Sequence, residues 1–348
     1  MRGPLLALAT FFALLTGLAA PLAAEPIRGA GSTFVAPLME RWQQRFREVQ
    51  ADGGDQLSVD LGVDYEPVGS LAGVMRASQL GMDFGVTERP LTTAELARDG
   101  LGQFPLVMGG ISIVANLEGV APGALQLTGP VLADIYLGRI TTWNAPAIAA
   151  LNPGLTLPAA PIKVVHRSDG SGTTYNLAVF LSGKSEAWKS SLGADTELRW
   201  TTGLGARGNA GVARAVRETR NAIGYVESGL AARLGLADVR LQNRSGAFVR
   251  ADAATISEAA LGVDWAKSAD FDLLIVDSPG AGAYPLVATV FVVAPKKRTP
   301  SRRAAFQFFR FALGDGSRDA LDLGYVPLPA PLVQTLIATW PKTFTGAR

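Results

Sequence analysis

The residues best suited to chemistry lie in one short segment, Arg167–Thr173, which has the sequence RSDGSGT. The apolar run 162–166 before it predicts a buried strand, and residues 175–181 after it predict the start of a helix. Glycines let successive backbone N–H groups turn toward one point, and a helix N-terminus adds unpaired N–H groups and a positive dipole end. The hydroxyls of Ser171 and Thr173 add donors, and the guanidinium of Arg167 adds a planar fork suited to an oxyanion. The segment predicts an oxyanion site, which by itself is compatible with binding or with catalysis.

Hydrolysis is the catalytic alternative. A serine hydrolase needs a nucleophile, a base and a group that orients the base. Ser171 could be the nucleophile, and His166, the one histidine in the chain, could be the base. However, His166 and Arg167 are neighbours on a predicted strand, so their side chains point to opposite faces. If Arg167 faces the ligand, His166 does not, and no G-x-S-x-G motif is present. We therefore favour binding, and expect His166 to be a packed or surface residue.

The composition removes several other functions. The chain has no cysteine, which excludes disulfides, thiol catalysis and thiolate metal sites, and a single histidine cannot form a His-rich zinc site. Neither a Walker A motif nor a metal-ligand spacing occurs, so we expect no metal and no cofactor. The formal charge of +2 is nearly balanced, which argues against a nucleic-acid or acidic-membrane surface.

The N-terminal residues are typical of a targeting sequence. Arg2 provides a positive start, Leu5–Leu18 is apolar almost throughout, and Leu22–Ala24 offers a small-residue cleavage site before Glu25. This pattern predicts a secretory signal peptide over residues 1–24. A membrane anchor is the weaker alternative, because the apolar core is shorter than the roughly 20 residues that a spanning helix needs. With no cysteine for lipid attachment, we expect the mature protein to be free in solution.

The rest of the chain predicts two α/β domains. It still exceeds the roughly 250–300 residues at which single cores tend to split. Predicted strands alternate with helices, which indicates α/β layers with largely parallel pairing. Two long apolar runs, Gln103–Asn116 and Tyr284–Pro295, are suited to strands that pass between the domains.

Three other predicted strand ends carry small, hydroxyl or charged residues. Gly29–Phe34 precedes a predicted helix, Pro67–Ser70 lies between a predicted strand, Val59–Tyr65, and a helix, and Glu88–Arg89 follows a short apolar strand. Ligands of open α/β sheets bind where the carboxyl ends of strands converge. Two of these features also have an ordinary interpretation: a glycine turn for Gly29–Phe34 and a solvated loop pair for Glu88–Arg89.

The motifs in combination resemble the PstS family, the periplasmic phosphate-binding proteins of ABC transporters. The resemblance covers nearly all of the chain after residue 24. The motifs that carry it, in chain order, are Gly29–Phe34, Val68–Ser70, Asp83–Gly85, Asp134–Gly138, Asn152–Leu155, Arg167–Thr173 and Ala222–Glu227.

This resemblance implies a two-lobed Venus-flytrap fold of the periplasmic binding protein type. Each lobe is expected to hold a mixed, mainly parallel sheet flanked by helices, with lobe I formed by 25–107 plus 285–348 and lobe II by 108–284. It implies a periplasmic monomer that binds inorganic phosphate in the cleft, without catalysis, and delivers it to the permease subunits and ATPase of an ABC transporter. The alternatives are a secreted phosphatase, or a binder of another tetrahedral oxyanion or a small phosphate ester, on the same scaffold.

The resemblance also implies which residues contact phosphate. Lobe I would contribute the backbone N–H groups of Thr33 and Phe34, the Thr33 hydroxyl and Ser70. Lobe II would contribute four donors from the segment Arg167–Thr173: Arg167, Ser171, Gly172 and Thr173. Asp169 would orient the guanidinium.

One position departs from the family pattern. Glu88 stands where the family has an aspartate, whose role is to accept a hydrogen bond from protonated phosphate and thereby to reject sulfate. If the loop retracts slightly, the extra methylene of Glu88 is accommodated. Otherwise it changes the selectivity or affinity for phosphate, or Thr87 takes over part of the contact. Arg89, next to Glu88, could form a compensating ion pair with it. We further expect hinges near Leu106–Gly109 and Tyr284–Leu286, with phosphate stabilising the closed state.

Overall fold

The computed structural model describes residues 26–52 and 62–347. The predicted signal peptide lies outside these residues, as does the start of the strand predicted over Val59–Tyr65. The strands are β1 (Ile27–Gly31), β2 (Val63–Glu66), β3 (Phe84–Thr87), β4 (Leu101–Ala115), β5 (Gln126–Leu127), β6 (Lys163–Arg167), β7 (Leu204–Ala206), β8 (Ala222–Glu227), β9 (Ala237–Asp238), β10 (Arg240–Gln242), β11 (Phe248–Val249) and β12 (Val287–Pro295).

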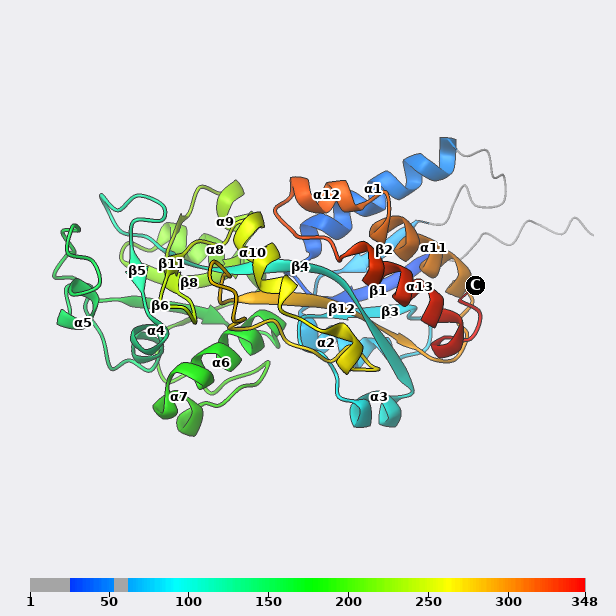
Figure 1. Cartoon of the computed structure of the whole chain (residues 1–348), viewed down its shortest axis with the longest axis horizontal. Coiled ribbons are helices and arrows are strands. Elements are labelled where there is room, and N and C mark those ends of the chain that lie inside the picture. Colours follow the sequence, from blue (N-terminus) through cyan, green and yellow to red (C-terminus); the bar gives the residue numbers. More distant parts are fainter. Residues whose placement is uncertain (1–25, 53–61, 348) are drawn as a thin grey trace, which may run out of the picture.

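The helices cover both faces of the sheet and both ends of the molecule (Figure 1). They are α1 (Ala36–Asp52), α2 (Ser70–Ala77), α3 (Thr93–Asp99), α4 (Gly129–Tyr136), α5 (Pro146–Ala149), α6 (Gly172–Lys184), α7 (Glu186–Ser191), α8 (Gly208–Glu218), α9 (Ser228–Arg233), α10 (Ala253–Leu261), α11 (Arg302–Leu313), α12 (Ser317–Asp322) and α13 (Ala330–Thr343), with a short 3₁₀ turn at Trp265–Lys267.

Among the described residues, nine strands form one continuous mixed sheet in the order β2-β1-β3-β12-β4-β8-β6-β7, with β9 beside β4. The strands β11, β10 and β5 form a separate three-stranded sheet. The outer strands pair in parallel on both sides: β2 with β1, β1 with β3, β8 with β6 and β6 with β7. The central strands β12 and β4 pair antiparallel with each other and with their outer neighbours. The two parallel parts of the sheet are therefore joined through β4 and β12.

Strand β4 is the common element of the two lobes. Its 15 residues are all buried, as expected for an apolar run without polar alternation. Residues 101–110 pair with β12, whereas Ile111–Ala115 pair with β8. The pairing with β12 shifts register between Val290 and Phe291, beside Pro105, which has no N–H to donate to the ladder.

Two groups of helices lie at opposite ends of the sheet, so the molecule has the predicted two-lobed shape (Figure 1). One group, α1 to α3 and α11 to α13, packs on the β2-β1-β3 part, which we call lobe I; the other, α4 to α9, packs on the β8-β6-β7 part, lobe II. Aromatic side chains fill the core of lobe I, where Phe104 contacts Phe306, Trp340 and Phe344. The lobe limits predicted at 107/108 and 284/285 fall within β4 and just before β12, and they stay a prediction.

One helix begins earlier than the sequence indicates. Residues 203–211 are glycine-rich, a composition typical of a flexible loop, but β7 and the first turn of α8 lie in this segment, and α8 begins at Gly208. The cause is long-range hydrogen bonding by Asn209, which lies in that first turn. Its side-chain oxygen accepts from the N–H of Glu227 in β8 (2.9 Å), which fixes a segment that composition marks as a loop.

Candidate anion-binding site between the lobes

Arg167 is a buried cation, and one edge of its guanidinium is paired with a carboxylate. Arg167 is the last residue of β6 and is 3% exposed. Its Nε donates to Asp169 Oδ1 at 2.7 Å and its Nη2 donates to Asp169 Oδ2. Burial alone would raise the pKa of Asp169, but the hydrogen bonds and charge of Arg167, with the N–H of Gly208, hold it below its ordinary value. The pair fixes the plane of the guanidinium and leaves Nη1 directed toward Thr173 Oγ1, 3.5 Å away.

The N-terminus of α6 lies beside this arginine. Ser171 is the N-cap residue, and its Oγ accepts from the N–H of Thr174 at 3.1 Å. Its own N–H donates to Thr196 O at 2.9 Å, so the Ser171 hydroxyl proton is the group left to face a ligand. The N–H of Gly172 donates to Ser70 Oγ of lobe I at 2.9 Å. The helix end is thus directed across the cleft at the opposite lobe.

Lobe I faces this helix end with residues from two of its junctions. Ser70 opens α2, and its Oγ donates to Glu88 Oε2 at 3.1 Å. Thr33 follows β1, and its hydroxyl accepts from both the N–H and the side-chain amide of Asn209 at 3.1 Å. The N–H of Phe34 donates to Ser32 Oγ at 2.9 Å. Hydrogen bonds from lobe II therefore reach both junctions.

Glu88 lies inside the site, at the end of β3, and is not a solvated loop residue. It is 1% exposed, and its backbone oxygen accepts from the Asn176 side chain in α6 at 2.9 Å. Its Oε2 accepts from Ser70, whereas Oε1 is buried with no hydrogen-bond partner among the described residues. Burial raises the pKa of Glu88 above its ordinary value, and the hydroxyl of Ser32 and the charge of Arg167 oppose this rise. This carboxylate is the acidic group at the centre of the donors.

Two expectations about neighbouring residues have different outcomes. The predicted compensating ion pair between Glu88 and Arg89 is wrong, because Arg89 points out of the site and pairs with Glu95 of α3.

His166 is a packed residue as expected: its ring stacks on Trp200 with centroids 4.6 Å apart, and its Nδ1 lies 3.0 Å from Arg167 O. Burial lowers the pKa of His166. Among the described residues, no hydrogen bond joins His166 to Ser171.

The structure brings all the predicted contact residues to one place between the lobes: Thr33, Phe34, Ser70, Glu88, Arg167, Ser171, Gly172 and Thr173, with Asp169 behind the arginine. We call this set, together with Ser32, the anion cradle. Sequence reasoning missed three supporting residues. Asn176 and Asn209 fix loops of the opposite lobe, and the Tyr225 hydroxyl accepts from the Arg167 N–H at 3.1 Å. Only Tyr225 lay in a quoted motif, and nothing local indicated that its hydroxyl would reach Arg167.

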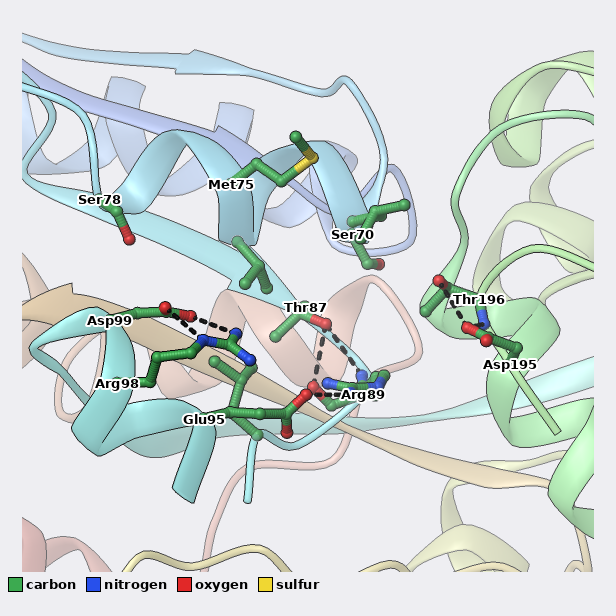
Figure 2. A pocket seen from close by; sticks show the side chains of 13 residues that line it. Ser70, Met75, Ser78, Thr87, Arg89, Glu95, Arg98, Asp99, Asp195 and Thr196 are labelled. Carbon is green, nitrogen blue, oxygen red and sulfur yellow. Dashed lines mark hydrogen bonds and ion pairs between the residues drawn. The ribbon is translucent and has the colours of Figure 1, made fainter. Parts of the chain in front are cut away.

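A cavity of about 390 Å³ opens beside the cradle. Figure 2 shows Ser70, Thr87 and Arg89 on one side of it, with Asp195 and Thr196 of lobe II facing them. Four charged side chains of its lining form two ion pairs, Arg89 with Glu95 and Arg98 with Asp99, whereas Asp195 accepts hydrogen bonds from Thr196 (Figure 2). The cavity borders the cradle through Ser70 and is a candidate route for a ligand to enter.

Metal-binding clusters and membrane-spanning helices are both absent from the part of the chain that the structure describes. In 26–52 and 62–347, no group of three or more Asp, Glu or His side chains is arranged to hold a metal ion. No helix in the same ranges is long and apolar enough to cross a membrane.

Comparison with known proteins identifies the class first. Residues 18–315 match the family model of the PBP superfamily domain, so the chain belongs to the PBP superfamily. Solved structures agree in fold: a phosphate-binding protein from Stenotrophomonas maltophilia superposes with a TM-score of 0.70 at 17% identity, covering 92% of this chain and 98% of its own. A phosphate-bound putative ABC transporter substrate-binding protein from Clostridium perfringens gives 0.64 at 20% identity, covering 88% and 100%.

Closer relatives give the family. A phosphate-binding protein PstS from Xylella fastidiosa is 41% identical over 91% of this chain and 85% of its own length. The PstS of Haemophilus influenzae is 35% identical over 95% and 97%. The chain therefore belongs to the PstS family of phosphate-binding proteins.

Proposed function

We propose that this protein binds inorganic phosphate in the anion cradle and delivers it to a membrane ABC transporter for uptake. The family supports this function, since its members are named for phosphate binding. The observation that carries it to this chain is the convergence of a buried arginine, a helix N-terminus and hydroxyls from both lobes on one point.

The chemistry of these groups suits a tetrahedral oxyanion. Arg167 supplies the positive charge, and its plane is fixed by Asp169. The hydroxyls of Thr33, Ser70, Ser171 and Thr173 and the end of α6 supply neutral donors, which can hold an anion without a metal or a lysine cage. No nucleophile–base pair lies among them, so we assign binding and not hydrolysis.

The role in transport sets the partners. The protein acts as a monomer in the periplasm, exported by the signal peptide at residues 1–24, and presents phosphate to the permease subunits and their ATPase. Low-salt pull-down of the mature chain on the reconstituted permease, with and without phosphate, tests this step. Failure of the loaded protein to stimulate ATP hydrolysis by that transporter would contradict it.

Titration calorimetry tests the binding itself. We expect the mature chain to bind phosphate and arsenate at one site per chain and to bind sulfate far more weakly. A small phosphate ester serves as the competing ligand, and release of phosphate from that ester is assayed in parallel. Tighter binding of the ester than of phosphate would favour the ester-binding alternative, and turnover would favour a phosphatase.

A further inference from the structure

The N-terminus of α8 is capped by residues of the anion cradle. The first N–H groups of a helix have no partner inside the helix, and the side chain of the N-cap residue usually accepts one of them. Arg207, the N-cap residue of α8, makes no such side-chain hydrogen bond. Instead, the N–H of Gly208 donates to Asp169 Oδ1 at 3.0 Å, and the N–H of Asn209 donates to Thr33 Oγ1 at 3.1 Å. One cradle residue from each lobe therefore caps this helix.

Asn209 binds the Thr33 hydroxyl with its side chain as well as with its backbone. Its Nδ2 donates to the same Oγ1 at 3.1 Å. A threonine hydroxyl has one proton to donate and two lone pairs with which to accept. Asn209 uses both lone pairs, and among the described residues no hydrogen bond takes the Thr33 hydroxyl as its donor. The proton of this hydroxyl is therefore left to face a ligand.

The Asn209 amide is itself fixed in orientation. The residue is 1% exposed, and its Oδ1 accepts from the N–H of Glu227 at 2.9 Å. Because a backbone N–H can only donate, the amide oxygen has to face Glu227 and the amide nitrogen has to face Thr33. Glu227 pairs with Ile111 of β4, the first residue of that strand to pair with β8 after the stretch that pairs with β12. Asn209 is thus anchored where β4 enters lobe II.

The two hydrogen bonds to Thr33 cross the cleft, so they exist only while the lobes are closed. Asn209 belongs to lobe II, and Thr33 follows β1 in lobe I. Ser70 of lobe I also accepts a hydrogen bond from lobe II, but its hydroxyl proton is already donated to Glu88. Closing the cleft at Thr33 therefore does something different, because it sets the direction of a donor that is still free.

We propose that Asn209 is a positioning residue of the phosphate site: on closure, its two N–H groups turn the Thr33 hydroxyl proton toward the ligand. The proposal rests on phosphate binding as the function. Asn209 acts through Thr33 and does not itself contact phosphate. Hydrogen bonds accepted by a hydroxyl also polarise its O–H group, which strengthens the hydrogen bond that it donates.

The test is a double-mutant cycle on phosphate affinity, measured by calorimetry for Asn209→Ala, Thr33→Val and the double variant. Thr33→Val removes the hydroxyl and should weaken binding by roughly 10-fold to 100-fold, the range for a hydrogen bond to a charged group. Asn209→Ala leaves the hydroxyl free to turn away and should weaken binding about tenfold, which corresponds to about one hydrogen bond. The double variant should bind no more weakly than Thr33→Val, because no hydroxyl is left to position.

Asn152→Ala is the matched control. Asn152 is also a buried asparagine of lobe II, and its amide bonds only to Gln126 and Ile148 in the same lobe. Its loss should lower the unfolding temperature and leave the phosphate affinity unchanged, both alone and combined with Thr33→Val. Thr33→Ser keeps the hydroxyl and should retain an affinity close to that of the wild type.

Circular dichroism checks that each variant is folded. If Asn209→Ala is not, Asn209→Asp takes its place in the cycle, since it keeps Oδ1 for the Glu227 N–H and loses the Nδ2 donor. The added charge repels phosphate with or without the Thr33 hydroxyl, so its effect cancels between the two arms of the cycle. What remains is the part of the loss that passes through the hydroxyl.

The outcomes separate this proposal from the function on which it rests. If the wild type does not bind phosphate, the assigned function is wrong, and the proposal fails with it. If the wild type binds and Asn209→Ala binds equally well, the function stands and the proposal is overturned. Losses that multiply in the double variant would overturn it too, because Asn209 would then only hold α8 against β8.

Discussion

Arg167 shows how a single residue is prepared for an anion. Its side chain is buried, and one edge of the guanidinium is held by the two oxygens of Asp169. A buried cation with a single carboxylate partner has donors to spare, since the guanidinium carries five N–H groups. The unpaired edge, at Nη1, faces Thr173 at the start of α6. The charge is thus kept in the site, and part of its hydrogen-bonding capacity is left for a ligand.

We expect Arg167→Ala to weaken phosphate binding by about 3 kcal/mol or more, roughly 100-fold in Kd, because the ligand charge would then be buried without a cation. The same change leaves Asp169 without its ion-pair partner, so the variant should also unfold at a lower temperature. Calorimetry and thermal denaturation measure the two effects. Arg199→Ala removes an exposed arginine from a nearby loop and should change neither. A near-unchanged phosphate affinity in Arg167→Ala would count against this assignment.

How far single residues could be predicted depended on the distance along the chain to their partners. The pairing of Arg167 with Asp169 joins residues only two positions apart at the end of β6, and the family resemblance implied it. The burial of Glu88 depends on Asn176, 88 positions away, which no local pattern indicates. Arg89 was given the wrong partner because adjacency suggested Glu88, whereas the turn into α3 brings Glu95 to it.

At the scale of elements, the approach of α6 to lobe I depends on a missing side chain. Gly172, the first residue of α6, donates its N–H to Ser70 of α2. Glu88 and Ser70 lie where a Cβ would have to be, at 2.6 to 2.8 Å, which is closer than such atoms pack. Glycine is therefore required at this position by the contact between the lobes, in addition to any role in binding the ligand.

We predict that Gly172→Ala pushes the lobes apart and lowers phosphate affinity by about tenfold or more, the usual cost of overpacking a close contact. Gly183→Ala is a matched control in the same helix, because a Cβ there meets nothing within 4 Å. The control should keep wild-type affinity and be neutral to about 1 kcal/mol more stable, since alanine favours helix. Calorimetry and thermal denaturation of the two variants supply the comparison. Equal affinities would show that the close approach at Gly172 does not matter for binding.

The elements themselves were predicted well where one pattern dominated. The strand expected at 162–166 is β6, Lys163–Arg167, and the helix expected over 175–181 lies within α6, Gly172–Lys184. The sequence does not indicate the start of α8 because glycines normally mark loops, and the hydrogen bonds of Asn209 that order the first turn join it to distant residues, Thr33 after β1 and Glu227 in β8. Alternating patterns report the face that an element buries, and they do not report such tertiary bonds.

For the whole molecule, two kinds of connection join the lobes. Strands β4 and β12 pass through the shared sheet, as their long apolar runs predicted. The second kind comprises polar contacts across the cleft, among them Gly172 to Ser70, Asn209 to Thr33, Asn176 to Glu88 O and the Leu71 N–H to Gly170 O at 3.2 Å. The strands are continuous and buried, whereas the polar contacts are few. Opening the cleft would break these polar contacts and bend β4 and β12.

The segments predicted as hinges lie in or next to the strands β4 and β12, which join the two lobes. Leu106–Gly109 is inside β4, where Met108 exchanges backbone hydrogen bonds with Val326, and Tyr284–Leu286 leads into β12. A ligand held by donors of both lobes binds the closed form more tightly than the open form, so it shifts the population toward closure. We therefore expect small-angle scattering to show a smaller radius of gyration when phosphate is added to the mature chain. Gly172→Ala should remain more extended at saturating phosphate, and Gly183→Ala should compact like the wild type. No compaction in the wild type, at a phosphate concentration that calorimetry shows to be saturating, would remove the hinge motion and leave a preformed closed site.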